Sequence, residues 1–142
     1  LGATKGLYGK YGDRLLDAPL SEAAYVGAAV GAATCGMRPI AELMFIDFVG
    51  VCFDQILNQA AKFRYMFGGK AETPVVIRAL VGAGFSAAAQ HSQMLTPMFT
   101  HIPGLKVVCP PPPARPSRAR QRPGDFLRTQ SALQHERRSA RR

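Results

Sequence analysis

Apolar residues recur along this chain at two spacings, one typical of helices and the other typical of buried strands. Between residues 46 and 66 the spacing is helical, because apolar side chains fall at i, i+3, i+4, i+7 and i+8: Phe53, Ile56, Leu57, Ala60 and Ala61. The Gly-Gly pair at 68–69 predicts the end of this helix. Residues 22–35, which are rich in Ala, and residues 92–101 predict two further helices.

Strand-like stretches separate these helices. Residues 38–45, 73–80 and 104–109 are short and apolar, and 73–80 contains the β-branched run Val75-Val76-Ile77. Helices and strands that alternate in this way predict an α/β fold with a parallel sheet flanked by helices. Ligands of such sheets bind at the carboxyl ends of the strands, so we expect functional residues to gather at that edge.

The predicted helix at 22–35 has recognisable boundaries. Ser21 precedes it as a candidate N-cap, and Gly36 follows it as a stop signal. Gly27 and Gly31 lie four residues apart on one helical face, and a glycine inside a helix costs about 1 kcal/mol. The pair therefore predicts that another backbone packs closely there, either in packing of the helix on the sheet or in contact with a ligand.

Three residues near the expected edge are candidates for chemistry. Glu22 opens the Ala-rich helix and is either a solvated acid of the first turn or a functional group. Phe48 lies in the first turn of the helix at 46–66 and would by default belong to the core. His91 follows a glycine-punctuated loop, and imidazole titrates close to neutrality. A histidine in a polar turn is usually a surface residue, but convergence with Glu22 and Phe48 favours a functional role.

Positive charge is concentrated toward the end of the chain. Residues 1–110 carry nine Lys and Arg against seven Asp and Glu, whereas residues 111–142 carry nine Arg against two acidic residues. This second stretch has little apolar surface to bury, so it predicts a disordered basic tail in which Leu127 and Leu133 support at most a transient helix. We therefore divide the chain into a partial domain at 1–110 and a Pro/Arg-rich tail at 111–142.

The cysteines and the apolar runs restrict the class of protein. Cys35, Cys52 and Cys109 form no Cys-x-x-Cys pair, which argues against a disulfide framework or a thiolate zinc site and favours a reducing cytoplasm. The first ten residues show no secretory signal. The longest uncharged run, at 23–37, is too short and too weakly apolar to cross a bilayer.

Six motifs between about residues 4 and 109 occur together and in order. They are 16–22 (LDAPLSE), 36–42 (GMRPIAE), 53–62 (FDQILNQAAK), 65–70 (YMFGGK), 88–93 (AAQHSQ) and 101–108 (HIPGLKVV). In these motifs the chain closely resembles the β subunit of the thiamine-diphosphate-dependent, decarboxylating component of 2-oxo acid dehydrogenase complexes. The pyruvate and acetoin dehydrogenase members are the most similar.

The resemblance implies a partial thiamine-diphosphate-binding fold, namely its pyrimidine-binding module. Glu22 matches the residue that hydrogen-bonds N1′ of the cofactor's aminopyrimidine, and Phe48 matches the aromatic residue on which that ring packs. His91 matches an active-site histidine near the reacting carbon, where it would steer the substrate or the lipoyl arm and transfer protons. The implied activity is oxidative decarboxylation of a 2-oxo acid such as pyruvate, or cleavage of acetoin, with transfer to lipoyl groups.

The resemblance also implies partners. An α subunit, in a heterotetramer of two α and two β subunits, holds the diphosphate and its magnesium, so no residue of this chain is assigned as a metal ligand. A lipoyl-bearing acyltransferase core accepts the product. The implied protein is cytoplasmic, with no membrane partner.

The chain departs from the family pattern at both ends. The family's amino-terminal segment would precede Leu1, and the resemblance stops after Cys109, where the composition changes. We hypothesise that residues from about 111 are a frameshift product or follow a misplaced gene end. Reading the nucleotide sequence in the other two frames tests this, because the absence of a Lys-Gly-Leu-like continuation in both frames excludes it. We expect the truncated chain to be inactive alone.

Other functions remain as alternatives to the enzymatic one. The nine Arg of the tail could bind nucleic acid or another polyanion non-specifically, yet Phe126 is the sole aromatic residue interleaved with them. A non-functional truncated product is a further alternative. A transketolase-like relative would share the cofactor chemistry, but the sequence around His91 argues against it.

Overall fold

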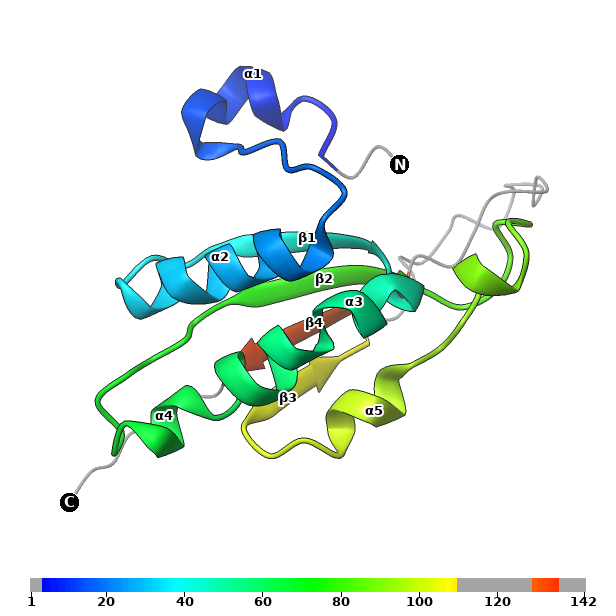
Figure 1. The fold of residues 1–142 in the computed structure, drawn as a ribbon. Helices are drawn as coiled ribbons and strands as arrows, with labels where there is room; N and C mark the ends of the chain where they lie inside the picture. The colour runs from blue at the N-terminus through cyan, green and yellow to red at the C-terminus, as the bar shows by residue number, and fades with distance from the viewer. Residues whose placement is uncertain (1–3, 110–128, 136–142) are drawn as a thin grey trace, which may run out of the picture.

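The computed structural model describes residues 4–109 and the strand at 129–135. Its elements are α1 (Leu7–Tyr11), η1 (Gly12–Arg14), α2 (Glu22–Thr34), β1 (Ile40–Phe45), η2 (Ile46–Phe48), α3 (Val49–Asp54), η3 (Gln55–Ala60), α4 (Phe63–Met66), β2 (Val76–Val81), η4 (Ala89–His91), α5 (Thr96–Thr100), β3 (Leu105–Val108) and β4 (Thr129–His135). Helices α2 and α3 lie against the sheet, whereas α1 stands apart from it (Figure 1). The predicted α/β fold is confirmed.

The sheet has the strand order β1-β2-β4-β3. β1 and β2 pair in parallel, and β4 pairs antiparallel with both β2 and β3, so β3 runs in the same direction as β1 and β2. Glu42 of β1 stands opposite Arg78 of β2, and their half-buried side chains form an ion pair. This cross-strand pair favours the observed register, because a shift by one residue would place the two charges on opposite faces of the sheet.

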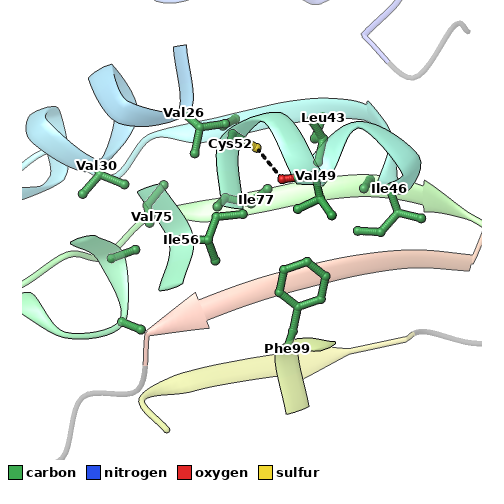
Figure 2. Packing of buried hydrophobic residues seen from close by; sticks show 14 of the residues in the cluster. Val26, Val30, Leu43, Ile46, Val49, Cys52, Ile56, Val75, Ile77 and Phe99 are labelled. Atoms are coloured by element: carbon green, nitrogen blue, oxygen red, sulfur yellow. Dashed lines mark hydrogen bonds between the residues drawn. The ribbon is translucent and has the colours of Figure 1, made fainter. Parts of the chain in front are cut away.

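The hydrophobic core fills the space between the sheet and the helices. Leu43 of β1 and Ile77 of β2 are buried, as the alternation of side chains along a strand predicts for one face. Val26 of α2, Ile56 of η3 and Phe99 of α5 meet them from the helical layer (Figure 2). One contiguous core therefore joins α2, β1, β2, α5 and the helical segments between β1 and β2.

The prediction of a single helix at 46–66 is wrong, because this stretch divides into η2, α3, η3 and α4. Segment η3 is π-helical, and the amide of Ala61 donates to the carbonyl of Ile56, five residues earlier, at 3.0 Å. The wider turn brings both Asn58 and Gln59 within hydrogen-bond distance of the Asp54 carboxylate, at 2.6 and 3.3 Å. These two donors lower the pKa of Asp54. They supply a local reason for the irregular turn that apolar spacing does not reveal.

Helix α2 follows its predicted boundaries, with Gly36 in a left-handed conformation just beyond it (φ 89°). Ser21 occupies the N-cap position, but its side chain makes no capping hydrogen bond. Close packing at Gly27 comes from the Gln55 side chain, since a Cβ there would lie 3.2 Å from Gln55 Oε1. Gly31 has open space around its Cβ position, so the expectation that both glycines face a neighbouring backbone is wrong.

The helix predicted at 92–101 is shorter than expected. Helix α5 covers Thr96–Thr100, with Pro97 in its first turn, where a missing amide proton costs no helical hydrogen bond. Residues 92–95 are not helical, because Gln93 bonds instead to the loops around it. The three predicted strands before residue 110 are confirmed with slightly shorter bounds.

Within the basic tail that the sequence predicts to be disordered, Thr129–His135 forms β4 between β2 and β3. The segment contains no proline, so each of its amides can donate to a neighbouring strand. The edges of β2 and β3 offer unpaired backbone groups for both sides of such a strand. Leu133 thus belongs to a strand and not to a transient helix. Residues 110–128, including Leu127, and residues 136–142 lie outside the described residues.

In residues 4–109 and 129–135, no helix combines the length and the apolar character that a bilayer crossing requires.

Candidate functional site

The candidate residues lie at the edge of the sheet where β1 and β2 end. Phe48 closes η2 directly after β1, and His91 closes η4 after the loop that follows β2. Helix α2 runs back toward the start of β1, so Glu22, its first residue, lies toward this same edge (Figure 1). The topology thus brings all three predicted residues to one side of the sheet, as expected for the carboxyl ends of parallel strands.

An aromatic cluster surrounds His91 and consists of Phe45, Phe48, Phe85 and His91 itself. The His91 ring centroid lies 4.9 Å from that of Phe45 and 5.4 Å from that of Phe48, with both pairs nearly perpendicular. Phe45 also contacts Phe48 at 6.1 Å and Phe85 at 5.8 Å. The structure therefore brings two of the three predicted residues, Phe48 and His91, into direct contact.

The His91 side chain is half-buried, and one of its ring nitrogens is isolated. Nδ1 is buried and has no hydrogen-bond partner among the described residues. An unpaired buried polar atom is costly, and such atoms concentrate at sites that bind other groups. Phe45 and Phe48 supply apolar contacts but no acceptor or donor for this nitrogen. The His91 ring is thus held by packing.

The loop that carries His91 departs from relaxed backbone geometry. Ser86 and Ala88 have positive φ values, 56° and 63°, although neither is a glycine. Such conformations cost of order 1–3 kcal/mol each and persist where the surroundings impose them. The Ser92 hydroxyl donates to the carbonyl of Ala88 at 2.7 Å and holds the turn around His91.

Two hydrogen bonds fasten the end of this loop to the sheet. The Gly82 amide, just after β2, donates to the carbonyl of Gln93 at 2.8 Å. The Gln93 amide in turn donates to Asp47 Oδ1 at 3.1 Å. The loop from Gly82 to Gln93 is therefore closed at its base and bound to the turn that follows β1.

The Glu22 carboxylate makes no hydrogen bond or ion pair with any described residue, and its charge acts on neighbouring groups. Burial first and the Glu22 carboxylate second raise the pKa of Cys52 from 9.0 to about 11. The same two causes raise the pKa of Tyr25 from 10.0 to about 12. A carboxylate without a partner at the start of a small-residue helix is available to bind a group that the chain itself does not supply.

These pKa shifts predict that stability falls in alkaline solution. The Cys52 thiol contributes stability fully below pH 9.0, its ordinary pKa, and loses that contribution as the pH rises through about 11. Tyr25 extends the decline toward pH 12. Urea unfolding at a series of pH values measures it. Cys52→Ala should flatten the decline, whereas the matched control Cys35→Ala, at an exposed cysteine, should leave it unchanged. Equal declines in the two variants would show that Cys52 is not responsible.

Three residues of this edge were missed by sequence reasoning: Phe45, Phe85 and Asp47. Phe45 appeared only as the end of a strand, and its spacing of three from Phe48 could have indicated that both rings leave the strand end together. Phe85 was noted only as a member of the loop. Asp47 gave no signal, because its bond to Gln93 joins residues 46 positions apart.

A separate cavity lies at the opposite edge of the sheet. It has a volume of about 290 Å³, and residues before β1 and β2 line it, including Arg38 and Pro74. Because parallel strands start at one edge and end at the other, this cavity is remote from the aromatic cluster. It has no part in the arrangement of Glu22, Phe48 and His91.

Comparisons with known proteins identify the family of this chain. Residues 1–122 match the family model described as transketolase, pyrimidine binding domain. The β subunit of acetoin:2,6-dichlorophenolindophenol oxidoreductase from Cupriavidus necator is 88% identical over 113 residues, which cover 80% of this chain and 33% of the relative. The corresponding subunit from Bacillus subtilis is 64% identical over 114 residues, with coverages of 80% and 33%.

A more distant relative extends this similarity to a second kind of enzyme. The mitochondrial β subunit of the pyruvate dehydrogenase E1 component from Homo sapiens is 49% identical over 108 residues, which cover 75% of this chain and 30% of the relative. The chain thus spans about a third of the length of the curated relatives that it matches.

Proposed function

Because the chain belongs to the family of transketolase pyrimidine-binding domains, we propose that it binds the aminopyrimidine of thiamine diphosphate beside Glu22, Phe48 and His91. The observation that carries the proposal is the contact of Phe48 with His91, at 5.4 Å, on the edge where the helix of Glu22 begins. These residues fit a flat heterocycle with polar edges. Glu22 offers an unpaired carboxylate, Phe48 an aromatic ring, and His91 an imidazole whose buried Nδ1 has no hydrogen-bond partner among the described residues.

Each residue has a distinct role in this proposal. The Phe48 ring packs against the pyrimidine, and the Glu22 carboxylate accepts a hydrogen bond at N1′ and holds a proton there. His91 orients the substrate near the reacting atoms and transfers protons. When bound, thiamine diphosphate would supply the nucleophilic carbon for chemistry at a substrate carbonyl. The protein's share is binding, orientation and proton transfer.

The proposed whole reaction is oxidative cleavage of acetoin, or decarboxylation of a 2-oxo acid, with transfer to lipoyl groups. Acetoin ranks before pyruvate because the chain is more similar to the acetoin oxidoreductase subunits than to the pyruvate dehydrogenase subunit. The proposal includes an α subunit that holds the diphosphate and magnesium, in an assembly of two α and two β subunits, and a lipoyl-bearing acyltransferase core. The three free cysteines support a reducing, cytoplasmic location.

A chimaera tests the proposed function. Residues 4–109 of this chain replace the matching region of the Cupriavidus necator β subunit, and the product is purified with the α subunit of that enzyme. We expect acetoin-dependent bleaching of 2,6-dichlorophenolindophenol that requires added thiamine diphosphate and magnesium. A folded chimaera without cofactor-dependent bleaching on acetoin or pyruvate would contradict the proposal.

A further inference from the structure

We propose that Phe45 and Asp47 are positioning residues, which hold His91 in the orientation that its function requires. The inference rests on the proposed function for the role of His91, and on the contacts of the described residues for everything else. Both residues belong to the short stretch that ends β1 and leads into α3. One rigid part of the sheet would thus control the loop that carries the imidazole.

Phe45 is the centre of the aromatic cluster, because it contacts each of the other three rings. Its centroid lies 4.9 Å from His91, 5.8 Å from Phe85 and 6.1 Å from Phe48. Phe85 and His91 stand near the two ends of the loop after β2. A single side chain from β1 therefore supports both parts of that loop, and edge-to-face contacts of this kind restrict how the rings can turn.

The backbone of β1 is irregular at the point where Phe45 leaves the sheet. Leu43 pairs with Ala79 and Phe45 with the next residue, Leu80, so Met44 is an extra residue on β1. Irregularities of this type redirect side chains and are frequent beside active sites. The shifted register gives Phe45 a direction that plain alternation along the strand would not.

Asp47 holds the other side of the same loop. Its Oδ1 accepts the Gln93 amide at 3.1 Å, and the Gln93 carbonyl accepts the Gly82 amide at 2.8 Å. Gln93 is two residues from His91, so a change in its position moves the imidazole. Phe45 therefore acts on His91 directly, by ring packing, and Asp47 acts on it through the hydrogen bond to Gln93.

His91 depends on these contacts because its own hydrogen bonding does not orient it. In most functional histidines a hydrogen bond to one ring nitrogen fixes the ring. Here Nδ1 is buried and has no partner within the described residues. The rings of Phe45 and Phe48 orient the imidazole instead, and their planes lie at 88° and 87° to it.

Chemical modification of the 142-residue chain tests the proposal without any cofactor. Diethyl pyrocarbonate acylates neutral imidazole, and mass spectrometry follows the rate at His91, with exposed His101 as internal reference. We expect Phe45→Ala and Asp47→Ala each to raise the His91 rate several-fold relative to His101. The His91 ring resonances in a histidine-labelled NMR spectrum should shift in both variants. Asp47→Asn keeps an acceptor oxygen for the Gln93 amide and should restore the original rate and spectrum.

A matched control separates positioning from general loss of packing. Phe67 forms a similar perpendicular pair with Phe63, at 5.5 Å, on the far side of the domain from His91, so Phe67→Ala should leave His91 unchanged. Unchanged His91 rates and resonances in folded Phe45→Ala and Asp47→Ala chains would overturn the proposal. If Phe45→Ala unfolds, equal His91 rates in Asp47→Ala and Asp47→Asn would overturn it. A response of His91 together with an inactive chimaera would reject the proposed function alone.

Discussion

Replacement of Glu22 by Gln in the chimaera is expected to lower acetoin turnover by about 100-fold or more, the usual contribution of a positioned acid or base. Glutamine has nearly the same size but cannot hold a proton in the way a carboxylate does. As a partly buried acid in a first turn, Glu22 would contribute only about 0.3–1 kcal/mol to the helix, so folding should be preserved. Dye bleaching at saturating thiamine diphosphate measures the loss.

Glu72→Gln is the matched control for this substitution. Glu72 pairs with Arg64 at 3.1 Å and lines the cavity at the opposite edge of the sheet. Because the ion pair is partly exposed, its loss should cost little stability and leave turnover unchanged. Full turnover in Glu22→Gln would remove the role proposed for the carboxylate. Equal losses in both variants would indicate a general effect of lost charge.

Phe99→Ala is expected to reduce the free energy of unfolding by about 3–5 kcal/mol. The Phe99 side chain is fully buried, contacts Phe53 at 6.0 Å and points into the cluster around Ile56 (Figure 2). Its removal leaves a cavity where α5 joins the helical layer. Domains of this size are stable by only about 5–15 kcal/mol, so the loss is a large part of the total. Urea denaturation followed by circular dichroism measures it.

The neighbouring Met98 provides the comparison within the same helix. Its side chain is 41% exposed, so Met98→Ala removes few core contacts and should cost well under half as much. Similar losses in the two variants would mean that helix propensity, and not the buried ring, determines the contribution of α5. A small loss in Phe99→Ala would show that the core closes around the gap.

The sequence predicted the parts of the fold that depend on local periodicity. Ile56, Ala60 and Ala61 are buried as their helical spacing indicates, and the β-branched run at Val75-Val76-Ile77 leads into β2. The edge that gathers Glu22, Phe48 and His91 was predictable as well. It follows from the alternation of helices and strands together with the rule for carboxyl ends of parallel strands.

The parts that escaped prediction depend on contacts between distant residues. The hydrogen bond between Asp47 and Gln93 and the packing of Phe45 on His91 join the end of β1 to a loop that follows β2. Strand β4 was missed because a polar segment becomes a strand only where two open edges accept it. The π-helical turn was missed because it changes the helical spacing by a single residue, which apolar periodicity cannot resolve.

Strand β4 also determines when the sheet can be completed during synthesis. In the described residues, β3 is joined to the sheet through β4 alone. The amino end of β2, at Val76, pairs with Gln134, so this ladder cannot close until β4 has left the ribosome. Such long-range pairing slows folding, because loop closure precedes any gain from the contacts. The nascent chain can therefore pair β1 with β2 early, whereas β3 can join the sheet only after β4 has been synthesised.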